Sequence, residues 1–345
     1  MHALPAQQSQ PSPEMPPAHP VLAMMINAAQ SQVLRVAAQL GIVDLLRDGP
    51  KTVAELAEAT GTQAPALARI MRALAYLDLV VETGPQQFTC TPLGTLLQAD
   101  TPTSLRGYAL IGGSPLFFHA WPQLLHSVQT GTSGFAALFG MPFYTYLQHH
   151  PAEAALFYEA MTSVSHYESL AICEVYDFST CHTVVDVGGG RGYLLATLLR
   201  TYPALQGILL DLPQVIDGAQ TVLAAEVAAE RCQLVGGDFL AAIPAGGDMY
   251  LIKRVLVDRD DTQAHTLLRH CREAMGPQGR VLVADPDLTS PYGLFFDLAM
   301  LMFFGGESRI RTETELRTLF ASAGLQLTRT MATSSALRLV EGVPA

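Results

Sequence analysis

The stretch Val184-Val185-Asp186-Val187-Gly188-Gly189-Gly190-Arg191-Gly192 decides the fold of this chain. Its first four residues, three of them valines, favour a buried strand, and the apolar run over 193–199 predicts the helix that follows. Glycines in such a turn let a ligand approach the backbone closely, and the helix start offers unpaired N–H groups to an anionic group. The stretch therefore predicts a strand–turn–helix unit that binds a nucleotide-like cofactor.

The glycine spacing is not that of a dinucleotide-binding turn. Such a turn requires Gly-x-Gly-x-x-Gly, because the third glycine allows the helix and strand to pack closely beside the pyrophosphate. Gly188 and Gly190 fit this pattern, but Tyr193 occupies the third glycine position. The sequence therefore disfavours a pyrophosphate ligand.

Acidic residues follow the next two predicted strands. Asp211 ends the apolar run 208–210, and Asp238 with Phe239 follows the run 233–235. A carboxylate at the first position accepts hydrogen bonds from both ribose hydroxyls. At the second position, Asp238 can accept a hydrogen bond from an adenine amino group while Phe239 stacks on the ring. Each acid alone would fit a helix cap or a solvated turn, but the ordered set favours S-adenosylmethionine (SAM), an adenosine with a small zwitterionic tail.

Composition limits the class of protein. The chain has 345 residues, 49% of them hydrophobic, which predicts two domains with a large core. A net charge of −11 argues against nucleic-acid binding. No apolar run approaches the roughly 20 residues of a membrane helix, and no secretory signal pattern is present. The five cysteines are scattered, without a Cys-x-x-Cys pair, so we predict a cytoplasmic protein with neither a disulfide framework nor a metal site.

The first part of the chain reads as a winged-helix domain over 21–100, after a disordered segment over 1–20. Helices are predicted over 23–40 and 63–77, a capping box opens another helix at Thr52, and a hairpin follows. DNA binding is the alternative, but only Arg69 and Arg72 are basic on the second helix. We therefore predict a role in homodimerisation.

A helical connecting and substrate-pocket region is predicted over 101–182, and an α/β domain over 183–345. Strands alternate with helices in the latter, which is typical of a doubly wound, Rossmann-like parallel sheet. Ligands of such sheets bind at the carboxyl ends of the strands, where the glycine turn, Asp211 and Asp238 are expected. The predicted strands are 184–187, 208–210, 233–235, 249–252, 281–284, 325–330 and 337–339.

With these residues in place, the chain resembles the SAM-dependent small-molecule O-methyltransferases of plant caffeate and flavonoid metabolism and of bacterial antibiotic tailoring. The resemblance spans 21–344 and rests on seven segments in combination: 185–192, 211–213, 237–239, 268–275, 279–283, 300–306 and 341–344. It implies a homodimer and a SAM site in the α/β domain. The residues that it assigns to SAM are Ser165, Gly188, Asp211, Leu212, Asp238, Phe239 and Lys253.

The chain departs from the family at the catalytic position. The family pattern Lys-x-Val-Leu-His-Asp-Trp reads here Lys253-Arg254-Val255-Leu256-Val257-Asp258-Arg259, so Val257 replaces the general-base histidine. An imidazole removes the proton of the acceptor hydroxyl, and an isopropyl group cannot. Of the two family carboxylates that steady the histidine, one matches Asp285 and the other falls near Ile310. Some antibiotic-tailoring relatives place a tyrosine where this chain has Phe139.

The acceptor pocket is predicted to be apolar. Phe296, Met300, Phe303 and Phe304 share one face of a helix over 294–304, which in the family lines the acceptor site. Methionine adapts to flat aromatic shapes, so a polycyclic or polyketide-like substrate is implied. We assign Asp285 to catalysis, and to substrate binding Phe139, Met161, Val257, Phe296, Asp297 and Met300.

Three functions remain open on the sequence. The first is an O-methyltransferase whose base is displaced or absent, which acts by positioning the acceptor. The second is a SAM-binding enzyme of the same fold that transfers no methyl group, such as a pericyclase, hydroxylase or decarboxylase. The third, a DNA-binding regulator, is disfavoured by the acidic composition.

Overall fold

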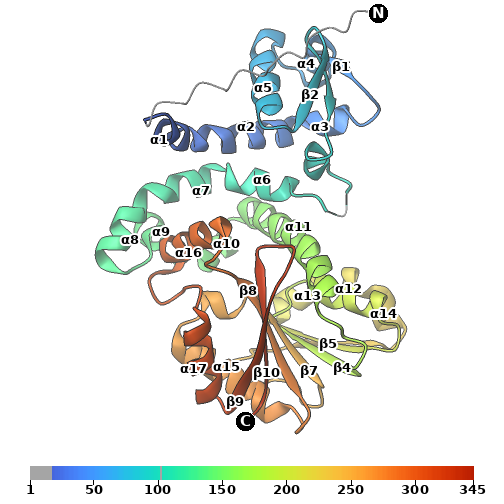
Figure 1. Ribbon diagram of the computed structural model, residues 1–345, viewed down its shortest axis with the longest axis vertical. Helices are drawn as coiled ribbons and strands as arrows, with labels where there is room; N and C mark the ends of the chain where they lie inside the picture. The colour runs from blue at the N-terminus through green and yellow to red at the C-terminus, as the bar shows by residue number, and fades with distance from the viewer. Residues whose placement is uncertain (1–17, 102) are drawn as a thin grey trace, which may run out of the picture.

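The computed structural model describes residues 18–101 and 103–345, and it has three parts along the chain (Figure 1). An N-terminal domain lies at one end, connecting helices follow, and an α/β domain carries the C-terminus at the far end. Of the predicted disordered segment 1–20, residues 1–17 lie outside the described residues. Residues 18–20 belong to helix α1 (Ala18–Met25), so that prediction extended too far.

The N-terminal domain has the predicted winged-helix elements, with one difference. The predicted helix 23–40 is broken at Ile26 into α1 and α2 (Asn27–Leu40). The capping box is present, since the Thr52 side chain accepts from the Glu55 N–H and Glu55 bonds back to Thr52. The other elements are α3 (Ile42–Leu45), α4 (Val53–Thr60), α5 (Ala64–Tyr76), β1 (Lys51–Thr52), β2 (Val80–Gly84) and β3 (Gln87–Cys90), with strand order β1-β3-β2.

Helix α1 exposes its apolar side chains. Val21, Leu22, Met24 and Met25 are 57–73% exposed, whereas Leu56, Met71 and Leu74 form a closed core with at most 2% exposure. An apolar helix of this kind needs a partner surface. The observation fits the expected homodimer.

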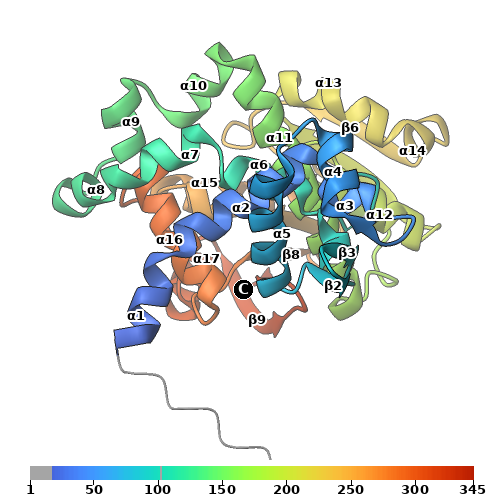
Figure 2. The same ribbon diagram turned by 90° about the horizontal axis from the view of Figure 1, so that it is seen from above.

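The connecting helices link the N-terminal domain to the α/β domain. Helix α6 (Arg106–Gly112) packs against α2 on one side and against the long helix α11 (Pro151–Val175) on the other, and the view from above follows this order (Figure 2). The other elements of this region are η1 (Gly94–Leu97), α7 (Pro115–Ala120), η2 (Trp121–Gln123), α8 (Leu124–Thr130), α9 (Gly134–Phe139) and α10 (Phe143–His149).

The α/β domain is built on a seven-stranded sheet with the order β6-β5-β4-β7-β8-β10-β9. Five strands are parallel, and β4 lies between β5 and β7, so the switch point of the doubly wound sheet falls at the glycine turn. The last two strands form an antiparallel hairpin beside β8. The strands are β4 (Thr183–Val187), β5 (Gln206–Asp211), β6 (Cys232–Gly236), β7 (Met249–Lys253), β8 (Arg280–Pro286), β9 (Leu325–Ala332) and β10 (Leu337–Pro344).

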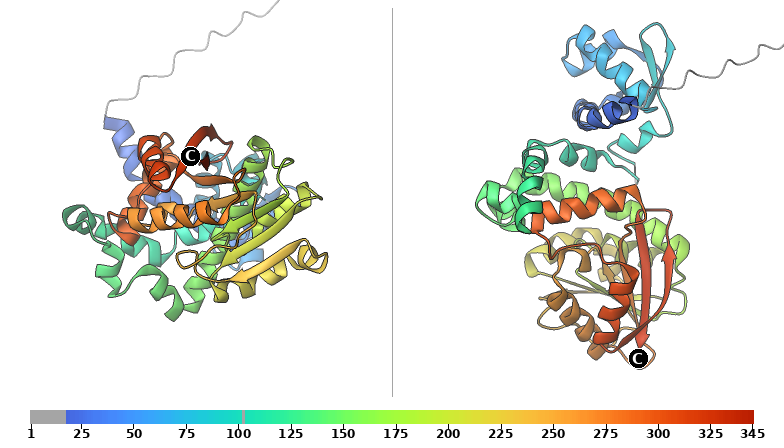
Figure 3. Two further views of the ribbon diagram at one scale, coloured as in Figure 1. Left: turned by 90° about the horizontal axis from the view of Figure 1, so that it is seen from below. Right: turned by 60° about the vertical axis from the view of Figure 1, so that its left-hand side comes forward.

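Helices cover both faces of the sheet (Figure 3). One core includes side chains of α15 and α17, and the other includes side chains of α11, α12 and α13. No helix in the described part of the chain is long and apolar enough to cross a membrane. The helices are α12 (Tyr193–Thr201), α13 (Pro213–Val222), α14 (Ala224–Ala228), η3 (Leu256–Asp258), α15 (Asp261–Ala274), α16 (Pro291–Phe304) and α17 (Glu313–Ser322).

Candidate active site

The glycine turn leaves room for a ligand between β4 and α12. Gly188 and Gly190 have φ values of +70° and +62°, a left-handed conformation that side chains rarely adopt. A Cβ on Gly188 would lie 2.8 Å from Val255 Cγ2, whereas a Cβ on Gly190 would meet nothing within 4 Å. Gly188 thus allows close packing, and Gly190 faces open space that a cofactor can occupy.

Asp186 lies under this turn without a hydrogen-bond partner. Both carboxyl oxygens are buried and unpaired within the described residues, and a Cβ on Gly189 would lie 2.4 Å from the Asp186 carboxyl carbon. Burial raises the pKa of Asp186 to about 7, although the Lys253 cation opposes the shift. A buried, unpaired carboxyl next to the turn fits a ligand that brings hydrogen-bond donors, as the zwitterionic tail of SAM does.

Asp211 is fixed at the turn by two backbone bonds. Its Oδ2 accepts from the Gly190 N–H at 2.8 Å and its Oδ1 from the Leu212 N–H at 2.7 Å. Each oxygen keeps a second lone pair for a ribose hydroxyl. Asp238 is exposed, and its Oδ1 accepts from the Leu240 N–H at 2.8 Å. The strand ends therefore bring the predicted acids to the same edge as the glycine turn.

Arg259, at the position where the resemblance predicts a tryptophan, covers Phe239. Its guanidinium lies 5.3 Å from the centre of the Phe239 ring, and its Nε lies 3.6 Å from Asp258 Oδ1. Guanidinium planes stack on aromatic rings as an indole does. Phe239, which is expected to stack on the adenine ring, is therefore covered by an arginine and is only 9% exposed.

Lys253 belongs to a buried ionic network that the sequence did not reveal. Glu168, on α11 one turn after the half-buried Ser165, lies 3.4 Å from Lys253 Nζ and accepts from Arg254 Nε at 2.8 Å. Burial favours the protonated acid, but the Arg254 and Lys253 cations hold the pKa of Glu168 below its usual value. Arg254 also lies over the Phe296 ring, 4.9 Å from its centre. The network connects the cofactor lysine to the acceptor helix α16.

The predicted acceptor side is apolar around Val257. Val257, Met300 and Ile310 are 3%, 8% and 4% exposed and pack in one cluster, with Phe296 and Phe304 against it. The resemblance placed the histidine at Val257 and one of its carboxylates near Ile310. Both positions at which the resemblance predicts a polar side chain thus hold apolar side chains in the same buried cluster.

The remaining predicted acceptor residues have varied surroundings. Phe139, at the end of α9, packs on Phe135 and Tyr146 with ring centres 4.4 Å and 4.9 Å away, and Met161 is half-buried on α11. Phe303 also joins this aromatic cluster, so the predicted apolar face of α16 divides between two clusters. Asp297 is engaged structurally, because its Oδ1 accepts from the Ile310 N–H at 2.7 Å.

Two further carboxyl groups lie near Val257. Asp285, at the end of β8, has a buried Oδ1 without a partner in the described residues, and burial raises its pKa to about 7. Asp258 follows Val257 directly, and its Oδ2 accepts from the Tyr144 hydroxyl at 3.3 Å. Asp258 and Tyr144 were not predicted as site residues, although Asp258 is part of the Lys253–Arg259 motif.

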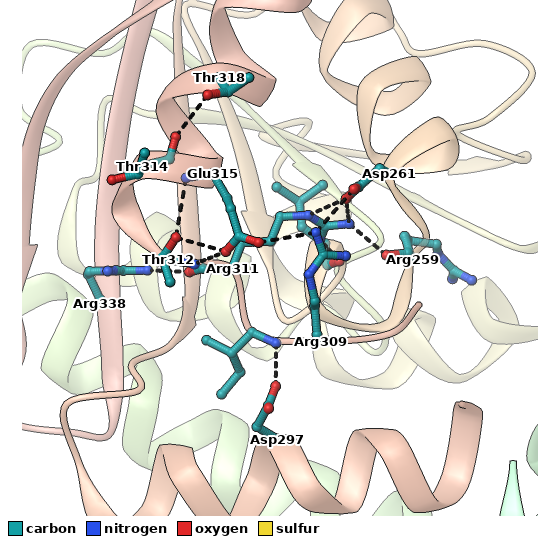
Figure 4. Close-up of polar contacts among 12 residues, drawn as sticks. Arg259, Asp261, Asp297, Arg309, Arg311, Thr312, Thr314, Glu315, Thr318 and Arg338 are labelled. Atoms are coloured by element: carbon teal, nitrogen blue, oxygen red, sulfur yellow. Dashed lines mark hydrogen bonds and ion pairs between the residues drawn. The ribbon is translucent and has the colours of Figure 1, made fainter. Parts of the chain in front are cut away.

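Arg311 holds the segment that carries Val257 and Asp258 (Figure 4). Its guanidinium donates to the Leu256 carbonyl at 2.6 Å, to the Arg259 carbonyl at 2.8 Å, and to Asp261 Oδ1 at 2.8 Å. The Arg311 side chain is 2% exposed. An arginine far along the chain therefore fixes both ends of this short turn, a contact that no sequence motif signalled.

Family comparisons cover most of the chain. The model of the O-methyltransferase domain matches residues 121–326, and that of the O-methyltransferase dimerisation domain matches residues 23–100. The second match covers the winged-helix domain, including all of α2 and the last three residues of the exposed helix α1. The expected homodimer is thereby supported, and DNA binding is not.

Individual relatives agree over nearly the whole length. A phenazine O-methyltransferase from Lysobacter antibioticus is 40% identical over 94% of this chain and 95% of that protein. A mitomycin biosynthesis 6-O-methyltransferase from Streptomyces lavendulae is 37% identical, covering 91% of both chains. A crystal structure of a calicheamicin biosynthesis methyltransferase, bound to S-adenosylhomocysteine (SAH), has a TM-score of 0.86 at 37% identity, covering 96% of this chain and all of that one.

Proposed function

This chain belongs to the O-methyltransferase family and depends on SAM, and from that premise we propose that it methylates a hydroxyl group of a flat, polycyclic secondary metabolite. The observation that carries the proposal is the pairing of a polar glycine-turn edge with an apolar, aromatic acceptor side. The relatives' substrates, a phenazine and a mitomycin precursor by their names, belong to the same chemical class.

The cofactor residues of this proposal are those at the strand ends. Gly188 packs the turn closely and Gly190 leaves space for the amino-acid tail, Asp211 and Leu212 frame the ribose, and Asp238 with Phe239 frames the adenine. Lys253 and the half-buried Ser165 complete the set. When bound, SAM supplies the methyl group: the O–CH₃ bond forms as the S–CH₃ bond breaks, and the electron pair of the broken bond stays on sulfur to give SAH.

The acceptor residues orient the substrate and exclude water. Phe296, Met300 and Val257 offer an apolar surface, to which we add Met161 and Phe139 at the aromatic side. Such packing holds the reacting hydroxyl in line with the methyl group, an effect worth roughly 7–11 kcal/mol in well-oriented systems. Asp285, at the end of β8, has a buried oxygen without a hydrogen bond within the described residues, which makes it the candidate to orient a polar group of the acceptor.

The non-methylating alternative receives no support from the comparisons. The relatives named above are methyltransferases by their descriptions, and the solved relative holds SAH, the product of methyl transfer. The loss of the histidine alone does not distinguish the two functions, because an acidic hydroxyl needs little help to ionise.

Labelled SAM provides the test of the proposed function. Purified protein incubated with methyl-labelled SAM and a hydroxyphenazine is expected to yield a labelled ether, and Asp285→Asn is expected to lower the rate. Calorimetry of SAM binding serves as the control for a folded cofactor site. Tight SAM binding without any labelled ether across a panel of hydroxylated polycyclic acceptors would favour the non-methylating alternative.

A further inference from the structure

The proton of an acceptor hydroxyl needs a destination other than residue 257. Val257 packs with Met300 and Ile310, and none of these three side chains binds a proton. Asp258 is the next residue, and it lies on the same short turn, η3. Whether Asp258 can act in place of a histidine base therefore depends on where its carboxyl lies relative to the apolar cluster of Val257, Met300 and Ile310.

The two oxygens of the Asp258 carboxyl have different surroundings. Oδ2 accepts from the Tyr144 hydroxyl at 3.3 Å, whereas Oδ1 is buried, lies 3.6 Å from the Arg259 Nε and makes no hydrogen bond within the described residues. The side chain is 12% exposed. A buried carboxylate oxygen without a donor is costly unless a ligand supplies one, and an acceptor hydroxyl is such a donor.

Tyr144 connects Asp258 to the apolar cluster that contains Val257 and Met300. Its ring stacks on Phe304 with centres 5.5 Å apart and planes at 28°, and it meets Phe157 edge-on. Phe304 in turn packs against the cluster of Val257 and Met300.

The charges around Asp258 favour a carboxylate that can be protonated during turnover. Burial raises its pKa, while the Arg259 cation on its own segment and the Tyr144 hydroxyl from α10 oppose that shift. Burial raises the pKa of Asp285 from β8, the Arg254 and Arg311 cations oppose that shift, and the nearby charge of Asp258 adds to it. A base with such surroundings accepts a proton more readily than an exposed aspartate.

Arg311 keeps the turn in place. Its bonds to the Leu256 and Arg259 carbonyls fix the backbone on both sides of Asp258, and two further bonds reach Asp261 Oδ1. Figure 4 shows Arg311 between Arg259 and Asp261. General-base catalysis requires this kind of fixed geometry within hydrogen-bond reach.

We infer that Asp258 takes the proton from the acceptor hydroxyl and that Tyr144 positions its carboxylate. This inference rests on the proposed function. As the new O–CH₃ bond forms, the acceptor O–H bond breaks and its proton passes to Oδ1 of Asp258, the oxygen that makes no hydrogen bond within the described residues. The neutral acid then releases the proton to solvent as the methylated product leaves, which restores the carboxylate.

The first experiment needs no turnover. In the complex of the protein with SAH, 1-nitro-2-naphthol serves as a probe whose visible spectrum reports whether its hydroxyl is ionised. A carboxylate beside the hydroxyl accepts its hydrogen bond and opposes a second negative charge, so the bound probe should ionise at a pH about one unit higher in the wild type than in Asp258→Asn. The control is Asp217→Asn, an exposed aspartate on α13, which should match the wild type.

The second experiment compares two acceptors that differ in acidity. With 2-naphthol, whose hydroxyl is protonated at neutral pH, Asp258→Asn should lower methyl transfer by about 10²–10⁴-fold. With 1-nitro-2-naphthol, already ionised in solution, the same variant should retain most of its activity. Tyr144→Phe should move the acidic limb of the 2-naphthol pH profile to higher pH, because the ionised carboxylate loses a hydrogen bond.

The outcomes separate this inference from the proposed function. Equal probe titrations in wild type and Asp258→Asn would overturn the role of Asp258, as would equal losses with both naphthols. If neither naphthol is methylated, the proposed function fails for these acceptors, while the probe titration still decides whether Asp258 faces the acceptor. A shifted titration supports Asp258 in either case.

Discussion

The two sides of the active site are built from different chemistry. The cofactor edge consists of backbone N–H groups and strand-end acids, with Asp211 tied to Gly190 and Leu212 by bonds of 2.8 Å and 2.7 Å. The acceptor side is an apolar cluster around Val257, with the carboxyls of Asp258 and Asp285 at its border. The cofactor edge carries the residues that the resemblance predicts there, whereas the position at which the resemblance predicts a histidine holds Val257.

This difference teaches that the two halves of one reaction site can change independently. The cofactor edge depends on the fold itself, because the glycine turn and strand ends are part of the sheet. The acceptor side depends on side chains that α10, η3, β8, α16 and the 305–312 loop bring together. A coordinated exchange, such as Val257 with Ile310, is possible there without disturbing the sheet.

The largest expected effect comes from breaking the acceptor side at Arg311. Arg311→Met leaves the Leu256 and Arg259 carbonyls without their donor, so the free energy of unfolding should fall by roughly 2–4 kcal/mol in urea titrations. SAM affinity should change far less. The matched control is Arg309→Met, which removes only exposed ion pairs with Asp261 and Glu315 and should cost below about 1 kcal/mol. Equal losses in the two variants would contradict the special role of Arg311.

The next effect compares the buried carboxyls of the two sides. The folded pKa of Asp285 is about 7, against an ordinary value of 3.8. Between these pH values the folded chain keeps a proton that the unfolded chain releases, so this group lowers stability as pH rises toward 7. Asparagine does not titrate, so Asp285→Asn removes this pH-dependent loss of stability. The difference in free energy of unfolding, variant minus wild type, should therefore be roughly 2–3 kcal/mol larger at pH 8 than at pH 4.

Asp186→Asn applies the same test of pH-dependent stability to the cofactor edge. The pKa of Asp186 is also raised to about 7 by burial, so the same pH signature is expected. Only the Asp186 variant should also change SAM affinity, measured by calorimetry. A flat pH dependence of the difference from wild type in both variants would disprove the raised pKa values.

Asp211→Ala tests the cofactor edge alone. The change removes a carboxylate that accepts hydrogen bonds, and SAM binding should weaken by about 1–3 kcal/mol. The exposed Asp217→Ala is the control on the following helix, α13. Unchanged affinity in calorimetry would remove Asp211 from the cofactor site.

The smallest expected effect concerns Val257. Val257→His places a polar ring against Met300 and Ile310, which should lower the free energy of unfolding by about 1–2 kcal/mol and impair the native reaction. Val257→His combined with Ile310→Asp supplies a partner for the imidazole and should recover part of the loss, as a double-mutant cycle would show. Strong acceleration of methyl transfer by Val257→His alone would mean that the chain is an impaired histidine enzyme rather than one with an altered base.

Local sequence patterns predicted the elements that carry the cofactor. The valine run and glycine cluster predicted β4, the turn and α12, and the acids at positions 211 and 238 predicted the strand ends that follow. These features depend on neighbours in the chain, so periodicity and turn chemistry reveal them. The break at Ile26 and the antiparallel pairing of β9 with β10 were not visible, because packing rather than propensity sets them.

The sequence by itself determined the winged-helix and doubly wound domains, the family, and the absence of histidine at position 257. Only the tertiary structure decided which residues surround that position: Ile310 against Val257, Tyr144 on Asp258, Glu168 between Lys253 and Arg254, and Arg311 on the carbonyls of η3. The physical reason is distance along the chain. Contacts between segments separated by dozens of residues leave no periodic trace, because each side chain is chosen for a neighbour that only folding supplies.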